Sequence, residues 1–210
     1  MPMTPAWEEP VGAVLDRFGL DDVTLIGISL GGGLAVRAAA YEPRVRRVVA
    51  VDVLDDFLEC LLRRAAPGPG PVLRALLSAR ARSIVNGIGR AAARDPLAAW
   101  GLRQGMHVTG TADPYGFFRA ARRFHTHGVS RLVTADVLLL AGTEDHYVPR
   151  HQLPRQAAAL VRARSVTTRV FTREQQGRYH CQIGHLGSCL DTFLTWYESL
   201  GPRREGVGIA

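Results

Sequence analysis

The chain has 210 residues, 47% of them hydrophobic and 21% charged, which is typical of one packed globular domain. This composition argues against a disordered, collagen-like or coiled-coil chain, and no apolar run reaches the roughly 18–20 residues that span a bilayer. The formal net charge is +7, but all 26 basic residues are Arg and lie scattered along the chain, so we expect no nucleic-acid partner and no membrane partner.

The first 53 residues alternate between helical and strand patterns. Residues 5–18 place apolar side chains at helical spacing and predict a helix. Residues 23–27 are a short apolar, β-branched run that predicts a buried parallel strand, followed by an Ala-rich helix over 30–41. A second buried strand is predicted over 45–53, and Asp52 lies near its end.

Residues 54–130 have a different pattern, because they hold amphipathic helical stretches and no convincing strand. A Pro- and Gly-rich break at 65–71 separates the first stretch from the second. We predict a helical cap insertion over 54–130, placed between the two parts of a core, 1–53 and 131–210. The predicted helices of the insertion cover residues 54–64, 72–94 and 115–124.

Strand and helix patterns alternate again after the insertion. Residues 136–141 and 165–171 predict strands, and residues 148–161 and 186–200 predict helices. Such alternation is typical of a parallel sheet that is covered by helices on both faces. The predicted fold class is therefore α/β, with three layers around a mostly parallel sheet.

A nucleophile turn is the clearest motif. Gly27-Ile28-Ser29-Leu30-Gly31 fits the pattern G-x-S-x-G and stands between a predicted strand and a predicted helix. On such a turn the hydroxyl of Ser29 projects above the sheet, and Gly27 and Gly31 avoid clashes that side chains would make. The backbone N–H of Leu30, at the start of the helix, can donate to an oxyanion. The alternative is a Gly-rich turn that binds a phosphate or only packs.

A serine hydroxyl needs a base that is oriented by an acid, and in this kind of sheet the chain order is Ser, acid, His. Asp145 follows the strand over 136–141, at the same edge of the sheet as Ser29, and is the preferred acid. Glu144 and Asp52 are competing carboxylates, because Asp52 follows the preceding strand and could also reach the site.

The loop over 172–185 supplies the base. His180 is preferred, since it lies nearer to the last strand; His185 is the alternative and is expected to help open the last helix. A zinc site formed by His180, Cys181, His185 and Cys189 is a competing interpretation, because His185 and Cys189 would lie one helical turn apart. It would leave the serine turn unexplained, so we expect no metal and no other cofactor.

The sequence resembles the α/β-hydrolase superfamily, and in particular an uncharacterised bacterial group related to the acyl-peptidase and esterase branch. The likeness follows nearly the whole chain in order. Residues 20–32 are similar to the serine turn of that group, residues 136–149 to its acid segment, and residues 171–184 to its histidine segment.

This resemblance implies that Ser29, Asp145 and His180 act as nucleophile, acid and base. His185 is a departure, because similar sequences usually have Asn there. Proteins of this fold also have several strands and an oxyanion loop before the nucleophile strand, whereas 28 residues precede Ser29 here. We therefore expect an N-terminally truncated form of the fold, with an exposed edge on the strand over 23–27.

The leading functional hypothesis is a serine hydrolase that cleaves a small-molecule carboxylic ester, thioester or amide through an acyl-enzyme. The alternative is a catalytically impaired fragment or a non-enzymatic interaction module, which includes a homodimer through the exposed strand edge. Nucleic-acid binding through the Arg excess is the weakest hypothesis. No secretory signal is visible and three cysteines fit reduced thiols, so the expected location is cytoplasmic.

Overall fold

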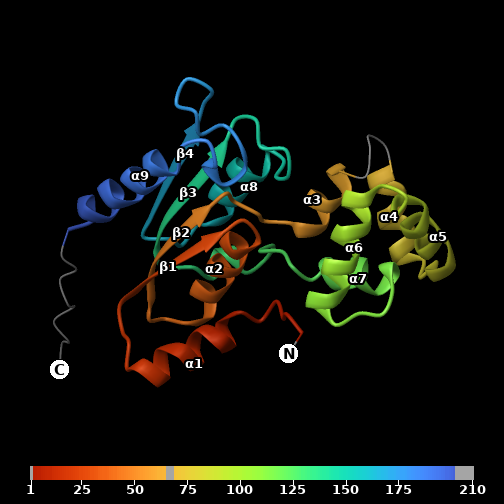
Figure 1. Cartoon of the computed structure of the whole chain (residues 1–210). Coiled ribbons are helices and arrows are strands. Elements are labelled where there is room, and N and C mark those ends of the chain that lie inside the picture. The colour runs from red at the N-terminus through yellow and green to blue at the C-terminus, as the bar shows by residue number, and fades with distance from the viewer. Residues whose placement is uncertain (1, 65–68, 202–210) are drawn as a thin grey trace.

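The core of the molecule is a parallel sheet with helices on both faces (Figure 1). The computed structural model describes residues 2–64 and 69–201. Within them, four strands pair in chain order and every pairing is parallel, which confirms the predicted α/β class. The strands are β1 (Val23–Ile28), β2 (Val45–Val51), β3 (Asp136–Gly142) and β4 (Ser165–Phe171), each within two residues of its predicted end.

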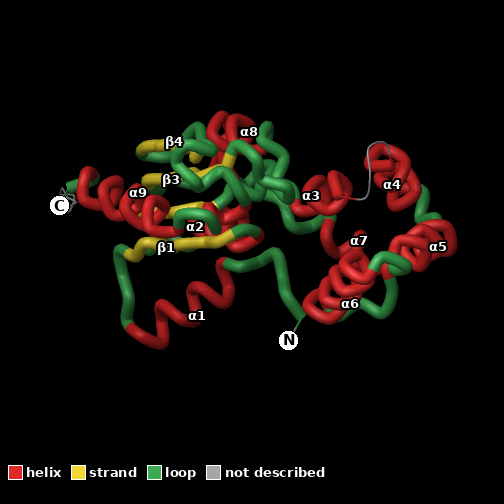
Figure 2. The backbone as a smooth tube through the Cα atoms, turned by 45° about the horizontal axis from the view of Figure 1, so that its top comes forward, coloured by secondary structure: helices red, strands yellow, loops and turns green. Residues whose placement is uncertain are grey.

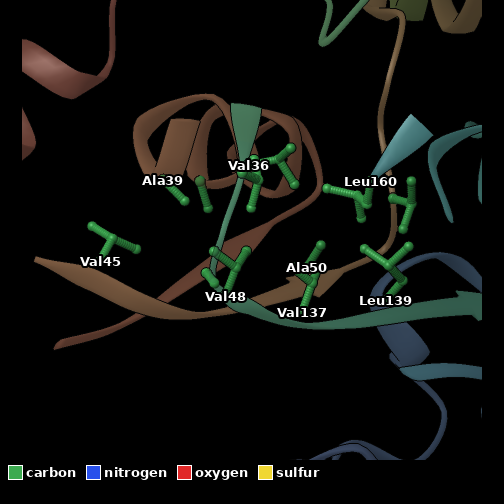
Figure 3. Packing of buried hydrophobic residues seen from close by; sticks show 12 residues of the cluster. Val36, Ala39, Val45, Val48, Ala50, Val137, Leu139 and Leu160 are labelled. Carbon is green, nitrogen blue, oxygen red and sulfur yellow. The ribbon is translucent and has the colours of Figure 1, made fainter. Parts of the chain in front are cut away.

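The two inner strands are buried on both sides. Val48 of β2 belongs to the hydrophobic cluster on one face of the sheet and Val49 to the cluster on the other, and both are fully buried. Figure 3 shows Val36 and Ala39 of the helix α2 (Leu30–Tyr41) packed over Val48 on the first face. Two-sided burial explains the continuous apolar runs over 48–51 of β2 and 137–141 of β3.

Helices of the core cover the two faces unequally. Apolar residues of α1, α2 and α8 join the cluster on one face, and Trp196 of α9 joins the cluster on the other. Figure 2 shows α1 and α2 beside β1 and α8 beside β4. The core helices are α1 (Glu8–Phe18), α2 (Leu30–Tyr41), α8 (Gln152–Ala159) and α9 (Leu186–Ser199), with short 3-10 turns η1 (Ser130–Leu132) and η2 (His180–Gln182).

The predicted ends of two core helices are wrong. The first helix begins at Glu8 rather than at residue 5. The helix α8 begins at Gln152 rather than at 148, because the carboxylate of Asp145 accepts hydrogen bonds from the backbone N–H groups of Tyr147 and Val148 and holds them in a turn.

Five described helices lie between β2 and β3 and pack on one another. Leu58, Leu77, Val85 and Phe117 belong to one buried cluster that is separate from the clusters of the sheet. The helices are α3 (Phe57–Arg64), α4 (Pro69–Ser78), α5 (Arg82–Ala92), α6 (Pro96–Thr109) and α7 (Pro114–Ala121). They lie to one side of the sheet in Figure 1. The division of the chain at residues 54 and 130 stays a prediction.

The helices within this insertion differ from the predicted ones. The single helix predicted over 72–94 is wrong, because Arg80 adopts a φ of 57° and separates α4 from α5. The helix α6 was not predicted, although Asp95 caps it by accepting a hydrogen bond from Ala98 N–H and Pro96 follows directly. Residues 65–68 of the predicted break lie outside the described residues. None of the helices described combines the length and hydrophobicity needed to cross a membrane.

Candidate active site

The parallel register brings the ends of the strands to one edge of the sheet. Ile28 pairs with Val51, and Val51 pairs with Leu140. The residues that directly follow β1, β2 and β3 therefore emerge side by side. This edge is where Ser29, Asp52 and Asp145 meet the loop after β4.

Ser29 occupies a strained turn between β1 and α2. Its φ is 56° and its ψ is −122°, a conformation that residues with side chains rarely adopt. A Cβ atom on Gly27 would lie 2.0 Å from the carbonyl oxygen of Gly31, so only glycine fits at position 27. The expectation of a similar clash at Gly31 is wrong, because a Cβ atom there meets nothing within 4 Å.

The two glycines after Gly31 are the ones that permit close packing. A Cβ atom on Gly32 would lie 2.6 Å from the carbonyl oxygen of Asp52, and one on Gly33 would lie 2.2 Å from that of Leu54. These glycines let the first turn of α2 press against the segment after β2. The G-x-S-x-G motif ends at Gly31, so it does not include Gly32 and Gly33. The run of three glycines after Leu30 was the sequence signal for this close contact.

His180 joins Ser29 to Asp145. Its Nε2 lies 2.9 Å from the Oγ of Ser29, and its Nδ1 lies 2.8 Å from the Oδ2 of Asp145. The serine, histidine and acid that the sequence singles out are therefore in hydrogen-bond contact in the expected order.

Asp145 is buried and held from its other side. Its Oδ1 accepts hydrogen bonds from the backbone N–H groups of Tyr147 at 2.6 Å and Val148 at 2.9 Å. Burial opposes its ionisation most strongly, but the hydrogen bonds from His180, Val148 and Tyr147 outweigh burial and lower its pKa. The carboxylate is thus fixed and charged beside the imidazole.

Asp52 is a second carboxylate at the same ring nitrogen. Its Oδ2 lies 3.0 Å from Nδ1 of His180, and the side chain is only 1% exposed. The backbone N–H of Cys181 donates to Oδ2, and Nε2 of Gln182 donates to Oδ1 at 2.8 Å. The sequence left Asp52 and Asp145 as competitors, whereas the structure brings both to His180.

The two carboxylates favour the protonated form of His180. Burial alone would lower its pKa, but hydrogen bonds to Asp145 and Asp52 outweigh burial and raise it. An imidazolium formed here during a reaction is therefore stabilised by two nearby negative charges.

The other predicted candidates lie elsewhere. Glu144 forms ion pairs with Arg173 and Arg178. His185 is exposed, and its Nδ1 donates to the carbonyl oxygen of Gln175. It occupies the N-cap position of α9 but makes no side-chain capping bond, so its expected role in opening that helix is not seen.

The four residues of the competing zinc interpretation do not come together. Cys189 is buried in the hydrophobic cluster with Phe171 and Trp196. Potential ligand atoms of Asp52, His180 and Cys181 do lie within 4.8 Å of one another. Asp52 lies at Nδ1 of His180, so a metal there would compete with Asp145 for that ring nitrogen.

Leu30 is the first residue of α2, which places its backbone N–H among the helix N-terminal donors that have no partner within the helix. Its side chain packs beside Leu54 and Val148. The N–H therefore lies directly after Ser29, where the sequence places an oxyanion donor.

A family model and several solved structures are similar to this chain. Residues 4–69 match the family model described as alpha/beta hydrolase fold. The solved structure of AbyA5 has a TM-score of 0.62 at 20% identity, over 96% of this chain and 51% of that chain. The chain has the α/β-hydrolase fold. A monoacylglycerol lipase from Paleococcus ferrophilus aligns with a TM-score of 0.55 at 22% identity, over 91% of this chain and 74% of the lipase.

The sequence is also similar to that of a curated fungal protein. Hydrolyase poxO of Penicillium oxalicum is 28% identical over 209 residues, which cover 89% of this chain and 49% of that protein. The chain thus spans about half the length of this relative. The predicted likeness to a bacterial group and the predicted N-terminal truncation stay predictions.

Proposed function

We propose that the protein is a serine hydrolase that cleaves a carboxylic ester, thioester or amide of a small molecule through an acyl-enzyme. The observation that carries this proposal is the hydrogen-bonded chain from Ser29 Oγ through the ring of His180 to Asp145 Oδ2. The name of the structurally similar monoacylglycerol lipase also supports hydrolysis.

In the acylation step, Ser29 Oγ attacks the carbonyl carbon of the substrate while its proton moves to Nε2 of His180. The carbonyl π electrons move to the oxygen, and the N–H of Leu30 donates to the resulting oxyanion. The oxyanion collapses, the bond to the leaving group breaks, and His180 gives its proton to the leaving group. The products of this step are the Ser29 ester and the free alcohol, thiol or amine.

Water completes the cycle. His180, again neutral, accepts a proton from water as the water oxygen attacks the acyl carbon. The second oxyanion collapses, the bond to Ser29 Oγ breaks and the proton returns to Oγ. Asp145 and Asp52 hold the imidazole and stabilise its cation in both halves of the reaction.

We assign the five helices between β2 and β3 to the role of a cap that shapes the substrate pocket. The start of this insertion is anchored to α8. The buried amide of Gln152 accepts from Asp55 N–H at 2.8 Å, and Arg155 forms a 2.6 Å ion pair with Asp55. Because these contacts fix the start of the insertion, they suit a cap that positions the substrate over Ser29.

Association through the edge of β1 is a second candidate function. This strand is at the end of the sheet order, and its Ile26 and Ile28 are 47% and 61% exposed. A second copy of the chain would then cover the edge. Light scattering should report a dimer that Ile26→Lys converts to a monomer; a wild-type monomer at all concentrations contradicts this candidate.

Labelling with a fluorophosphonate probe tests the hydrolase proposal. The wild-type protein should be labelled, and Ser29→Ala should not. Ser83→Ala, which removes an exposed serine of the insertion, is the matched control and should be labelled like the wild type. Labelling that persists in Ser29→Ala, or folded wild-type protein without labelling, contradicts the proposal.

A further inference from the structure

A cavity lined by basic side chains lies between the core and the insertion. It has a volume of about 590 Å³, within the range of roughly 300–1,000 Å³ that is usual for small-molecule sites. We call it the arginine cleft. Its lining residues are Pro5, Arg37, Arg119, Arg122, Arg123 and His125.

We propose that the arginine cleft binds an anionic group of the substrate, a carboxylate or a phosphate, while the scissile carbonyl lies at Ser29. This inference rests on the proposed hydrolase function and adds the chemical class of its substrate.

The lining residues come from three separate parts of the chain. Arg37 belongs to α2, Pro5 precedes α1, and the remaining side chains belong to α7 and the segment that follows it. Figure 1 shows α7 on the side of the insertion that is nearer to α2. The cleft is therefore built by the fold and is not a basic run of the sequence.

Three of the four cleft arginines have no carboxylate partner in the part of the chain that the structure describes. Within residues 2–64 and 69–201, no ion pair involves Arg119, Arg122 or Arg123, whereas Arg37 pairs with Glu8 at 3.1 Å. The guanidinium of Arg119 instead lies over the ring of Tyr115. Clustered guanidinium groups without counter-charges create a positive potential that a carboxylate or phosphate would neutralise.

His125 adds an unused hydrogen-bonding group to this wall. Its Nδ1 is buried and has no hydrogen-bond partner among the described residues. Its ring stacks on His127 with centroids 4.9 Å apart, which fixes its orientation. The ring therefore forms a fixed part of the cleft wall.

A small second cavity adjoins the cleft near the start of α2. It has a volume of about 10 Å³, shares Pro5, Arg37 and His125 with the cleft, and is also lined by Leu30. Leu30 follows Ser29 directly and carries the proposed oxyanion donor. The shared lining places the cleft beside the residue next to the nucleophile, so we expect an elongated substrate to extend from Ser29 past Leu30 to the arginines.

Two matched substrate pairs test the inference and distinguish the source of the anion. In the first pair, mono-p-nitrophenyl glutarate carries a carboxylate on its acyl group and p-nitrophenyl butyrate does not. In the second pair, butyryl-coenzyme A carries phosphates on its leaving group and butyryl-N-acetylcysteamine does not. We expect kcat/KM to favour the anionic member of at least one pair, and Arg122→Glu/Arg123→Glu to reduce that preference roughly 10- to 100-fold. Arg122→Lys/Arg123→Lys should retain most of it.

Arg90→Glu/Arg94→Glu is the control, because it makes the same charge change on exposed insertion residues that do not line the cleft. It should alter the preference less than about 3-fold, as expected for surface charges screened by salt. No preference in either pair, or equal loss in the control, overturns the inference.

Calorimetric titration of the Ser29→Ala protein separates this inference from the proposed function. Glutarate or coenzyme A should bind, and the double reversal at Arg122 and Arg123 should abolish binding even if the wild type shows no probe labelling. If neither glutarate nor coenzyme A binds, while the wild-type protein is labelled by the probe, the anion site is refuted and the hydrolase proposal stands. Tighter binding of a 12-nucleotide single-stranded DNA than of both small anions would overturn the small-molecule assignment.

Discussion

The sheet edge and the helical insertion position side chains in different ways. At the edge, parallel register and tight glycine contacts set Ser29, Asp52 and Asp145 within a few residues of the strand ends. In the insertion, α7 and the segment after it present exposed arginines around a cavity. In the function proposed above, the edge holds the reacting groups and the insertion selects the substrate. Changes at the edge should affect kcat, and changes in the insertion should affect KM or stability.

The largest expected effect is that of His180→Ala. Loss of the proposed base should lower kcat/KM by roughly 10⁴–10⁶, because triad members act as a unit. His185→Ala is the matched control from the same loop and should stay within about 3-fold of the wild type. Steady-state kinetics on a p-nitrophenyl ester measures both, and comparable losses in the two variants would refute the assignment of the base.

A cavity in the insertion should cost stability and leave the chemistry intact. Leu77 is 2% exposed within the insertion cluster, so Leu77→Ala should lower the free energy of unfolding by roughly 2–5 kcal/mol. At temperatures where the variant is folded, the rate of fluorophosphonate labelling should be close to that of the wild type. A large loss of labelling in folded protein would show that the two regions are not separable in this way.

Two glycines at the start of α2 should respond differently to substitution by alanine. Gly33→Ala should destabilise the protein by roughly 1–3 kcal/mol, because the new Cβ atom would lie 2.2 Å from the Leu54 carbonyl oxygen. Gly31→Ala introduces a Cβ atom with open space around it in a helix, so it should be neutral or stabilising by up to about 1 kcal/mol. Urea unfolding of the two variants measures the contrast, and equal stabilities would contradict it.

The smallest predicted effect is a shift in pH dependence. Both carboxylates raise the pKa of His180, and its neutral form is the proposed base, so the rate falls on the acid side of that pKa. Asp52→Asn removes one of the two charges, so the pKa falls and the acid limb of the kcat/KM profile moves to lower pH. We expect a shift of about one unit or more. An unchanged limb would mean that Asp52 does not act on the imidazole.

The sequence predicted the core well because burial leaves a strong signal there. Residues 48–51 and 137–141 of the inner strands are apolar on both faces, and the serine turn, the chain order and the family resemblance together predicted that Ser29, Asp145 and His180 converge. Asp52 stayed an open alternative, because its contact with His180 depends on local backbone: Asp52 and Cys181 have φ values of 60° and 53°. No pattern of residue types fixes such angles.

The insertion was predicted less well for a related reason. The break between α4 and α5 falls at Arg80, in a left-handed conformation that Arg seldom adopts, with no Gly or Pro beside it. The arginine cleft joins residues that are more than 80 positions apart, such as Arg37 and Arg119, so it cannot be seen in the scattered arginines of the sequence. The start of α6 did carry a sequence signal, Asp95 followed by Pro96. The helix was still not predicted, because its apolar residues form only a weak helical pattern.

The central claim is that Ser29 is the nucleophile that His180 activates. Peptide mass spectrometry of the wild-type protein after fluorophosphonate treatment tests it most directly. We predict one phosphonyl adduct, on the peptide that contains Ser29, and its loss in folded His180→Ala protein. An adduct on another residue, or an adduct on Ser29 that forms equally fast without His180, would contradict it.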